Sequence, residues 1–283
     1  MSLSENDDYE TVLDKVTKDG SYLKDASEIL RNDKAIVMTA VKRDGLALEF
    51  ASERLQDDEE VVMTAVKKNG TSLEYASDTL RDDKEVVMAA VKRDPNALLY
   101  VSERLRNDKE IVMEAVKKDG ECIEYASDTL RDDKEVVMAA VKNNGQALKH
   151  VSERLRDKYE IVLAAVQCSE LALEFASKRL KEDRKIVLAA IKNDGSALAY
   201  VSDRLKEDEE LALEAVKNKK CILDCVSEIF QQSSGFISKI LLFDKNIEYK
   251  TLKEDTQLEW LSRFGFNTIR NMKKSHDICF LFK

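Results

Sequence analysis

The fold is decided by residues 82–106, which read DDKEVVMAAVKRDPNALLYVSERLR. The serine of this stretch, Ser102, recurs every 25 residues without insertion along most of the chain. A leucine, or once a phenylalanine, lies three residues after each serine, and a leucine or isoleucine lies four residues before it. Nine copies in one register cover about residues 8–232 and predict a tandem repeat architecture. The serines of the series are Ser27, Ser52, Ser77, Ser102, Ser127, Ser152, Ser177, Ser202 and Ser227.

Each 25-residue unit holds two apolar segments separated by a polar turn. In the quoted unit these segments are residues 86–91 and residues 97–105. The apolar residues Leu98, Val101 and Leu105 of the second segment have helical rather than strand spacing. Both segments are also rich in residues that favour helices. We therefore expect two helices of about ten residues in each unit.

Polar residues mark the ends of the expected helices. An aspartate or asparagine lies three residues before a glutamate at the start of the first helix, which is the spacing of a capping box. These pairs are Asp57/Glu60, Asp82/Glu85, Asn107/Glu110, Asp132/Glu135 and Asp157/Glu160. A lysine lies at the end of the first helix, where the helix dipole favours a cation. The lysines are Lys42, Lys67, Lys92, Lys117, Lys142, Lys192 and Lys217.

A glycine follows Asp or Asn in the turn between the two helices of six units. One interpretation is a left-handed glycine that ends the first helix. Pro95 holds this position in the quoted unit, and proline cannot adopt a positive φ. The better interpretation makes Asp94 the N-cap of the second helix and Pro95 its first residue. The glycines are Gly20, Gly45, Gly70, Gly120, Gly145 and Gly195.

A single unit is too small to fold alone. Its two short helices shield only one side of each other, and the first segment is apolar at six consecutive positions, so that segment needs cover on nearly all sides. Neighbouring units can supply this cover. We therefore expect an all-α fold, an α-solenoid of nine 25-residue two-helix repeats over residues 8–232, preceded by an N-terminal tail at residues 1–7.

The repeat resembles the tandem helical repeats of the Domain of Unknown Function 4116 family. The resemblance is carried by the segments Asp83–Val91, Ala97–Leu98 and Val101–Leu105. Repeats of this family often occur as pairs of units, and the chain shows a matching second period near 50. The resemblance implies a helical repeat fold, and it implies no activity. The alternating motifs are ASDTL at residues 76–80 and 126–130 and VSERL at residues 101–105 and 151–155.

Composition excludes several classes of protein. With 43% hydrophobic residues among 283, the chain can bury a core and is not a disordered acidic segment. Five cysteines make no disulfide framework, so we expect a reduced, cytoplasmic location. The net charge of −9 argues against a phosphate-backbone partner, and residues 1–230 hold 37 Lys and Arg against 49 Asp and Glu. No apolar run approaches the ~18 residues of a membrane span, and no secretory signal is visible.

An aromatic ladder occupies one position of the second helix, at the edge of its apolar sector. Its rings could grip a peptide or stack on nucleic-acid bases. They could equally pack between successive second helices, and the mixture of Phe, Tyr and His suits packing better. The first and last units depart from the pattern, with Asp25 and Cys225 there, as capping units should. The ladder consists of Phe50, Tyr75, Tyr100, Tyr125, His150, Phe175 and Tyr200.

The repeated polar residues favour structural roles. No His or Asp arrangement recurs beside the serines, so we expect each hydroxyl to bond the carbonyl four residues earlier and to allow close helix packing. A row of arginines is expected to be neutralised by acidic caps of the following first helix on a solvated edge. The arginines are Arg54, Arg104, Arg154, Arg179 and Arg204.

Metal and cofactor chemistry has little support. His150 and His276 are far apart, and Cys221 and Cys225 share one helix face with no further ligand nearby, so core packing is the better interpretation. Cys122, Cys168 and Cys279 are isolated. No phosphate loop or dinucleotide fingerprint is present. We expect no metal, no cofactor and no enzymatic activity.

The period stops after residue 232, and an aromatic-rich segment follows at residues 233–283. It is expected to cap the last repeat, as solenoids require. Its alternative role is a docking motif around Trp260 and Phe264.

Function is inferred from architecture rather than from a site. The leading hypothesis is a non-enzymatic protein–protein interaction scaffold that uses an extended solenoid surface. One alternative is an effector or regulatory protein of an intracellular bacterium, delivered to a host cytosol, whose repeats recruit a host protein. A less favoured alternative is a single-stranded nucleic-acid binder that uses the aromatic ladder.

Overall fold

The computed structural model describes residues 8–218 together with Phe230, Ser233 and Phe236. The chain divides into two compact units, Met1–Arg156 and Asp157–Lys283, which are described separately. No strand occurs between residues 8 and 218, and the repeats form an all-α solenoid, as expected. Each complete repeat has a long α-helix, a six-residue 3-10 helix and a four-residue α-helix.

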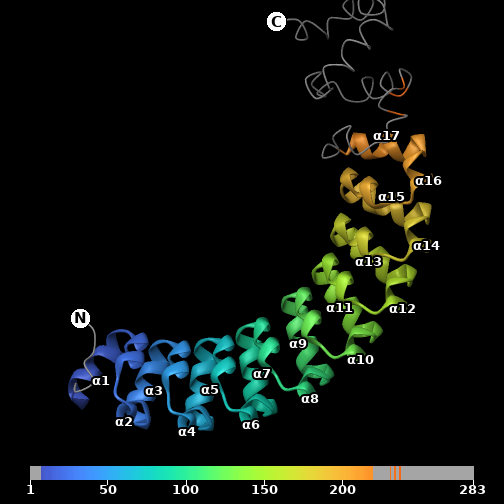
Figure 1. The fold of residues 1–283 in the computed structure, drawn as a ribbon. Helices are drawn as coiled ribbons and strands as arrows, with labels where there is room; N and C mark the ends of the chain where they lie inside the picture. The colour runs from blue at the N-terminus through green and yellow to red at the C-terminus, as the bar shows by residue number, and fades with distance from the viewer. Residues whose placement is uncertain (1–7, 219–229, 231–232, 234–235, 237–283) are drawn as a thin grey trace, which may run out of the picture. The chain divides into compact units, whose positions relative to one another are not determined.

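Within each unit the long helices form one row and the short helices another (Figure 1). The long helices of the first unit are α1 (Tyr9–Lys18), α3 (Lys34–Arg43), α5 (Glu59–Lys68), α7 (Lys84–Arg93), α9 (Lys109–Lys118) and α11 (Lys134–Asn143). Its 3-10 helices are η1 (Gly20–Asp25), η2 (Gly45–Phe50), η3 (Gly70–Tyr75), η4 (Pro95–Tyr100), η5 (Gly120–Tyr125) and η6 (Gly145–His150). Its short α-helices are α2 (Glu28–Arg31), α4 (Glu53–Gln56), α6 (Asp78–Arg81), α8 (Glu103–Arg106), α10 (Asp128–Arg131) and α12 (Glu153–Arg156).

The second unit repeats the same order of elements. They are α13 (Tyr159–Cys168), η7 (Glu170–Phe175), α14 (Lys178–Lys181), α15 (Arg184–Asn193), η8 (Gly195–Tyr200), α16 (Asp203–Lys206) and α17 (Glu209–Lys217). The expected tail at residues 1–7 and most of residues 219–283, including the expected cap, lie outside the described residues.

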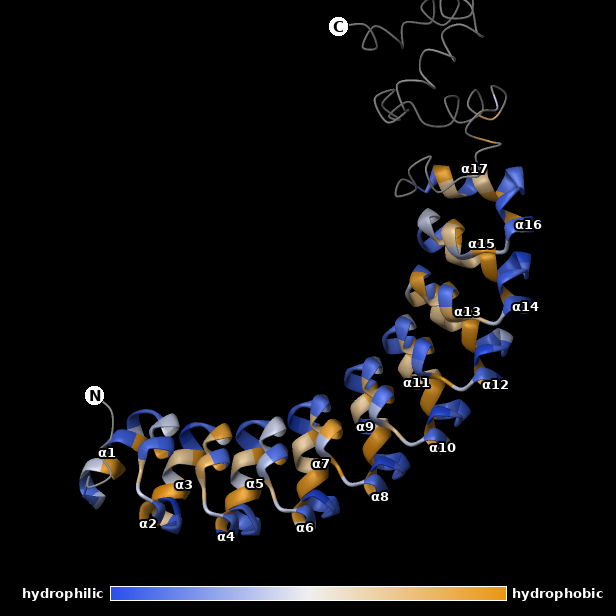
Figure 2. Cartoon of the chain, in the orientation of Figure 1, coloured by the Kyte–Doolittle hydropathy of each residue, from blue (hydrophilic) through white to orange (hydrophobic). Residues whose placement is uncertain are grey.

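The long helices after α1 bury residues on more than one side. In α7 the residues Val86, Val87, Ala90 and Val91 are fully buried, and α7 packs against α5, α9, η3 and η4. Figure 2 shows the hydrophobic residues gathered in the long and 3-10 helices, while the short helices are mostly hydrophilic. Adjacent repeats of a unit therefore share one core, and they supply the cover that a single repeat lacks.

The prediction of a continuous second helix of ten residues is wrong, because the segment is divided into a 3-10 helix and a short α-helix. In the quoted repeat, η4 ends at Tyr100, Val101 and Ser102 are not helical, and the chain becomes helical again in α8. The break occurs because the Ser102 N–H donates to the carbonyl of Arg81 in the preceding repeat, at 3.1 Å, instead of to its own helix. The Ser102 hydroxyl then caps α8 by accepting from Leu105 N–H at 3.3 Å.

The expected capping boxes do not form, because the N-cap lies one residue later and a valine or isoleucine, not the glutamate, is the third helical residue. The N-cap of α7 is Asp83, whose Oδ1 accepts from the N–H groups of Glu85 and Val86 at 2.9 Å each. Asp82, the expected cap, ends α6, and its carboxylate is bound by the next repeat. Counted from its N-cap, the repeat begins at Asp83, so Asp82 belongs to the preceding repeat. Asp83 acts within its own repeat, and Asp82 connects two repeats.

The turn before each 3-10 helix follows the second interpretation. Asp94 caps η4 by accepting from Asn96 N–H at 2.9 Å, and Pro95 is the first residue of η4. The left-handed interpretation is wrong for Gly45 and Gly70, whose φ angles are not positive. Glycine is needed because successive repeats approach closely at this position. A Cβ on Gly45 would lie 2.5 Å from the Ala65 carbonyl oxygen of the next repeat.

Candidate interaction surfaces

The aromatic ladder forms at the end of the 3-10 helices. Phe50, Tyr75, Tyr100, Tyr125, His150, Phe175 and Tyr200 are the last residues of η2 to η8. Each side chain is half-buried, with one part against the core and one part open to solvent. This placement agrees with the edge of the apolar sector predicted for the ladder. It allows inter-repeat packing and also leaves part of each ring available for contact.

Exposed glutamates lie directly beside the tyrosines in the first unit. Burial, and then the carboxylates of Glu49 and Glu74, raise the pKa of Tyr75. Burial also raises the pKa of Tyr100, whose hydroxyl is hydrogen bonded with Glu74 and whose neighbours include Tyr75 and Tyr125. The ladder of the first unit is therefore an aromatic and acidic surface, with neutral phenols at physiological pH.

His150 takes the place of the aromatic ring in η6. Its Nε2 lies 3.7 Å from Glu121 Oε2 and 3.8 Å from Glu124 Oε2, and this buried nitrogen has no hydrogen-bond partner among the described residues. Burial lowers the pKa of His150 below 6.5, and this effect exceeds the opposing attraction of Glu124. The imidazole is therefore neutral at pH 7.

We expect His150→Phe to stabilise the protein more at pH 5.5 than at pH 7.5. The pKa of His150 is lowered in the folded state, so the unfolded chain takes up a proton more readily and stability falls as the pH drops below about 6.5. Phenylalanine removes this loss and the unpartnered nitrogen. Urea denaturation of both chains at the two pH values measures the effect. Equal midpoint differences at both values would contradict it. His276 is present in both proteins, so any effect of its titration cancels when their midpoints are compared.

The repeated serines connect successive repeats. The Ser102 hydroxyl donates to Asp82 Oδ1 of the preceding repeat, so the expected bond to the carbonyl four residues earlier is wrong. Arg104 Nε lies 3.0 Å from both carboxylate oxygens of Asp82, and its Nη2 donates to the Asp82 carbonyl at 2.7 Å. The hydrogen bonds from Ser102 and Arg104 lower the pKa of Asp82. Arg104, Arg154 and Arg179 are neutralised by an aspartate of the preceding repeat rather than by the following caps, whereas Arg54 donates to the neutral Asn32.

A second set of ion pairs connects the starts of the long helices and was not predicted. Lys84 Nζ lies 2.8 Å from Asp108 Oδ2 and 2.8 Å from Glu110 Oε2 of the next repeat. Lys34 and Lys109 form equivalent double contacts. The signal in the sequence was a lysine that precedes an Asp by 24 residues and a Glu by 26, a separation that only the repeat period makes meaningful.

The C-terminal ends of the long helices carry a second group of cations, which do not contact the aspartates and glutamates at the helix starts. We call this set the basic edge, and it comprises Lys42, Arg43, Lys67, Lys68, Lys92, Arg93, Lys117 and Lys118. All eight side chains are exposed. Among the described residues, Lys118 is the one member that forms an ion pair, with Glu114 at 3.3 Å. The next long helix ends with Asn143 in place of the second cation.

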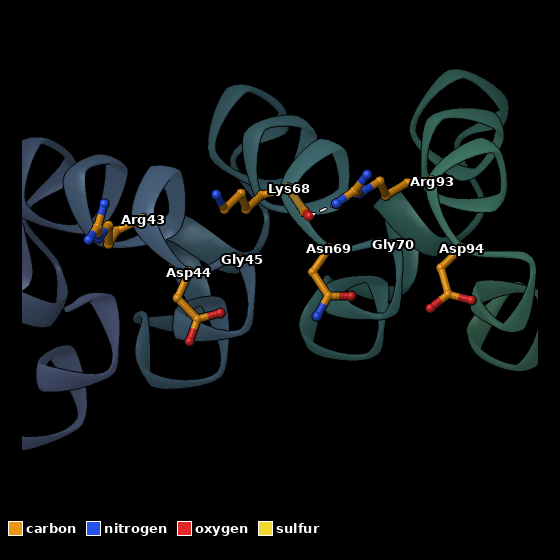
Figure 3. A pocket seen from close by; sticks show the side chains of 8 residues that line it. All are labelled: Arg43, Asp44, Gly45, Lys68, Asn69, Gly70, Arg93 and Asp94. Carbon is orange, nitrogen blue, oxygen red and sulfur yellow. Dashed lines mark hydrogen bonds between the residues drawn. The ribbon is translucent and has the colours of Figure 1, made fainter.

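A depression of about 390 Å³ lies on the basic edge between the second and fourth repeats. Arg43, Lys68 and Arg93 form one side, and Asp44, Asn69 and Asp94 form the other, with Gly45 and Gly70 between them (Figure 3). Arg43 and Arg93 donate through Nε to the carbonyls of Lys18 and Lys68 at 3.1 Å each, which holds the guanidinium groups along the edge. The depression therefore has a cationic rim and an acceptor rim.

The remaining predicted residues do not form a site in the part of the chain that is described. No group of three or more potential metal ligands occurs there. No helix found there could cross a membrane. Trp260, Phe264, Cys221, Cys225, His276 and Cys279 lie outside the described residues.

Comparison with protein families matches the chain to a domain of unknown function (DUF4116) in overlapping tandem segments. The matched residues are 8–56, 36–81, 58–106, 83–131, 108–156, 158–203 and 183–231. Neither the curated proteins nor the solved structures contain a match to the chain.

Proposed function

Because the chain belongs to the DUF4116 family of tandem helical repeats, we propose that it is a non-enzymatic scaffold that binds proteins along its repeat surface. The observation that carries this proposal is the aromatic ladder, which keeps rings half-buried at one position of successive repeats beside exposed glutamates. The core already holds these rings in place, so they lose little side-chain entropy when they contact a partner.

The charge beside the rings favours a partner with Lys or Arg side chains. Glu49, Glu74 and Glu124 attract such cations, and the faces of Tyr75 and Tyr100 can accept them. Six of the repeated serines support the non-enzymatic part of the proposal, since their hydroxyls donate to a side chain of the preceding repeat. They are Ser52, Ser77, Ser102, Ser127, Ser152 and Ser177. A cytoplasmic location is part of the same proposal and agrees with the thiol of Cys122, which forms no disulfide.

We expect the triple variant Glu49→Lys, Glu74→Lys, Glu124→Lys to lose protein partners that the unchanged chain captures. All three glutamates are exposed, so the variant reverses charge beside the rings without opening the core. The matched control is Glu28→Lys, Glu53→Lys, Glu103→Lys, which reverses three exposed charges on the short helices. Quantitative affinity capture compares the three chains, with circular dichroism to check folding. If the ladder variant retains the same partners as the control, the ladder is not the binding surface.

A further inference from the structure

Two sets of cations on the long helices of the first unit have different surroundings. Lys34, Lys84 and Lys109, at the starts of long helices, each contact two carboxylates of the next repeat. The basic edge, at the ends of long helices, holds eight cations over four consecutive repeats, and one of them has a carboxylate within 4 Å among residues 8–218. Repeat packing therefore uses the first set and leaves seven of the eight cations of the basic edge without an ion pair among the described residues.

The basic edge has a regular spacing and two defined ends. Packed helices lie about 8–10 Å apart, so successive pairs of cations recur at about that distance. The edge begins after Lys18, which is paired with Asp14 at 2.6 Å, and it ends before Asn143. Four repeats with three intervals therefore make an edge roughly 24–30 Å long.

An extended peptide in the polyproline II conformation fits this spacing. It rises ~3.1 Å per residue with three residues per turn, so every third side chain points the same way at intervals of about 9 Å. One acidic residue in three would then meet one pair of cations per repeat. Such a peptide has no internal hydrogen bonds, and its N–H groups can donate to the acceptor rim formed by Asp44, Asn69 and Asp94.

A nucleic acid fits the same edge less well. Its phosphates follow one another more closely than the repeats do, and those between the cation pairs would face the carboxylates of Asp44 and Asp94. No aromatic residue belongs to the basic edge to stack on bases.

We propose that the basic edge of the second to fifth repeats binds an extended polypeptide with an acidic residue at every third position. The site uses different residues from the aromatic ladder and goes beyond the scaffold function proposed above. Arg43 and Arg93, already held by carbonyl bonds, would provide fixed donors, while Lys67, Lys68 and Lys92 would adjust to the carboxylates.

The test is fluorescence anisotropy of the full chain with labelled twelve-residue peptides. The first probe is four Glu-Pro-Pro triplets, and the second holds the same four Glu and eight Pro with the glutamates consecutive. We expect the regularly spaced probe to bind about tenfold more tightly, a difference of about 1.4 kcal/mol. Added salt is expected to weaken its binding. Equal affinity for the two probes would overturn the proposed recognition of spacing.

Variants separate the basic edge from general charge. Lys67→Glu with Lys92→Glu is expected to weaken the regularly spaced probe about tenfold. The control Lys24→Glu with Lys178→Glu has the same net charge and is expected to bind normally, since these exposed lysines lie elsewhere. The ladder variant is also expected to bind normally. If a twelve-nucleotide single strand binds more tightly than the peptide and depends on Lys67 and Lys92, the edge is a nucleic-acid site and the proposal is wrong.

Discussion

Gly70→Ala is expected to lower the free energy of unfolding by about 1–3 kcal/mol, the usual range for overpacking a well-packed interior. A Cβ on Gly70 would collide with the carbonyl oxygen of Ala90 and would lie 2.8 Å from both Cβ and N of Asp94, all in the next repeat. Two of these three atoms belong to the backbone, so no side-chain rotation relieves the clash. Urea denaturation followed by circular dichroism measures the change.

The control for Gly70→Ala is Pro95→Ala at the same register of the following repeat. Pro95 already carries a Cβ there, so its interface accommodates that atom and the substitution is expected to have a small effect. Similar losses in the two variants would show that glycine is not needed for the close approach of successive repeats.

Ser72→Ala is expected to raise the free energy of unfolding by about 1–3 kcal/mol, because a buried polar group without a hydrogen bond is costly. Ser72 is fully buried, and its hydroxyl oxygen has no partner in the described structure. Alanine fits this register, as other repeats demonstrate with Ala47, Ala97, Ala147, Ala172 and Ala197, all buried.

The control for Ser72→Ala is Thr71→Ala, one residue earlier. The Thr71 hydroxyl donates to Asn69 Oδ1 at 2.8 Å, so Thr71→Ala removes a hydroxyl that has a partner and is expected to give no gain. Midpoints of urea denaturation compare the two variants. A destabilised Ser72→Ala protein would mean that the Ser72 hydroxyl is satisfied in solution.

The repeat fold was predictable because its signals are local or strictly periodic. Pro95 excluded a positive φ by its chemistry alone, and the structure confirms Asp94 as the cap that precedes it. The recurrence of Ser102 at 25-residue intervals required like units packed side by side. The position of Tyr100 at the edge of the apolar sector likewise followed from helical spacing, and the ring is half-buried.

The break inside the second segment was not predictable from one repeat. Leu98, Val101 and Leu105 have helical spacing and are all buried although the helix is broken between them, so the spacing of apolar residues does not reveal the break. What stops the helix is the bond from Ser102 N–H to Arg81, which exists only once the preceding repeat is in place. The same dependence hid the true partner of Asp82, because a capping box and a bond to the next repeat call for the same residue type.

The bonds between repeats all depend on fixed separations along the chain, such as 20 residues from Asp82 to Ser102, 22 to Arg104, and 24 from Lys84 to Asp108. Removing one residue from a unit would change these separations, and the unit's hydrogen bonds and ion pairs to both neighbours would no longer align. Adding or removing a whole unit would leave each remaining separation unchanged. The number of units can therefore change by duplication or loss of 25-residue blocks, and the reach of the protein can evolve, or be engineered, independently of its interior.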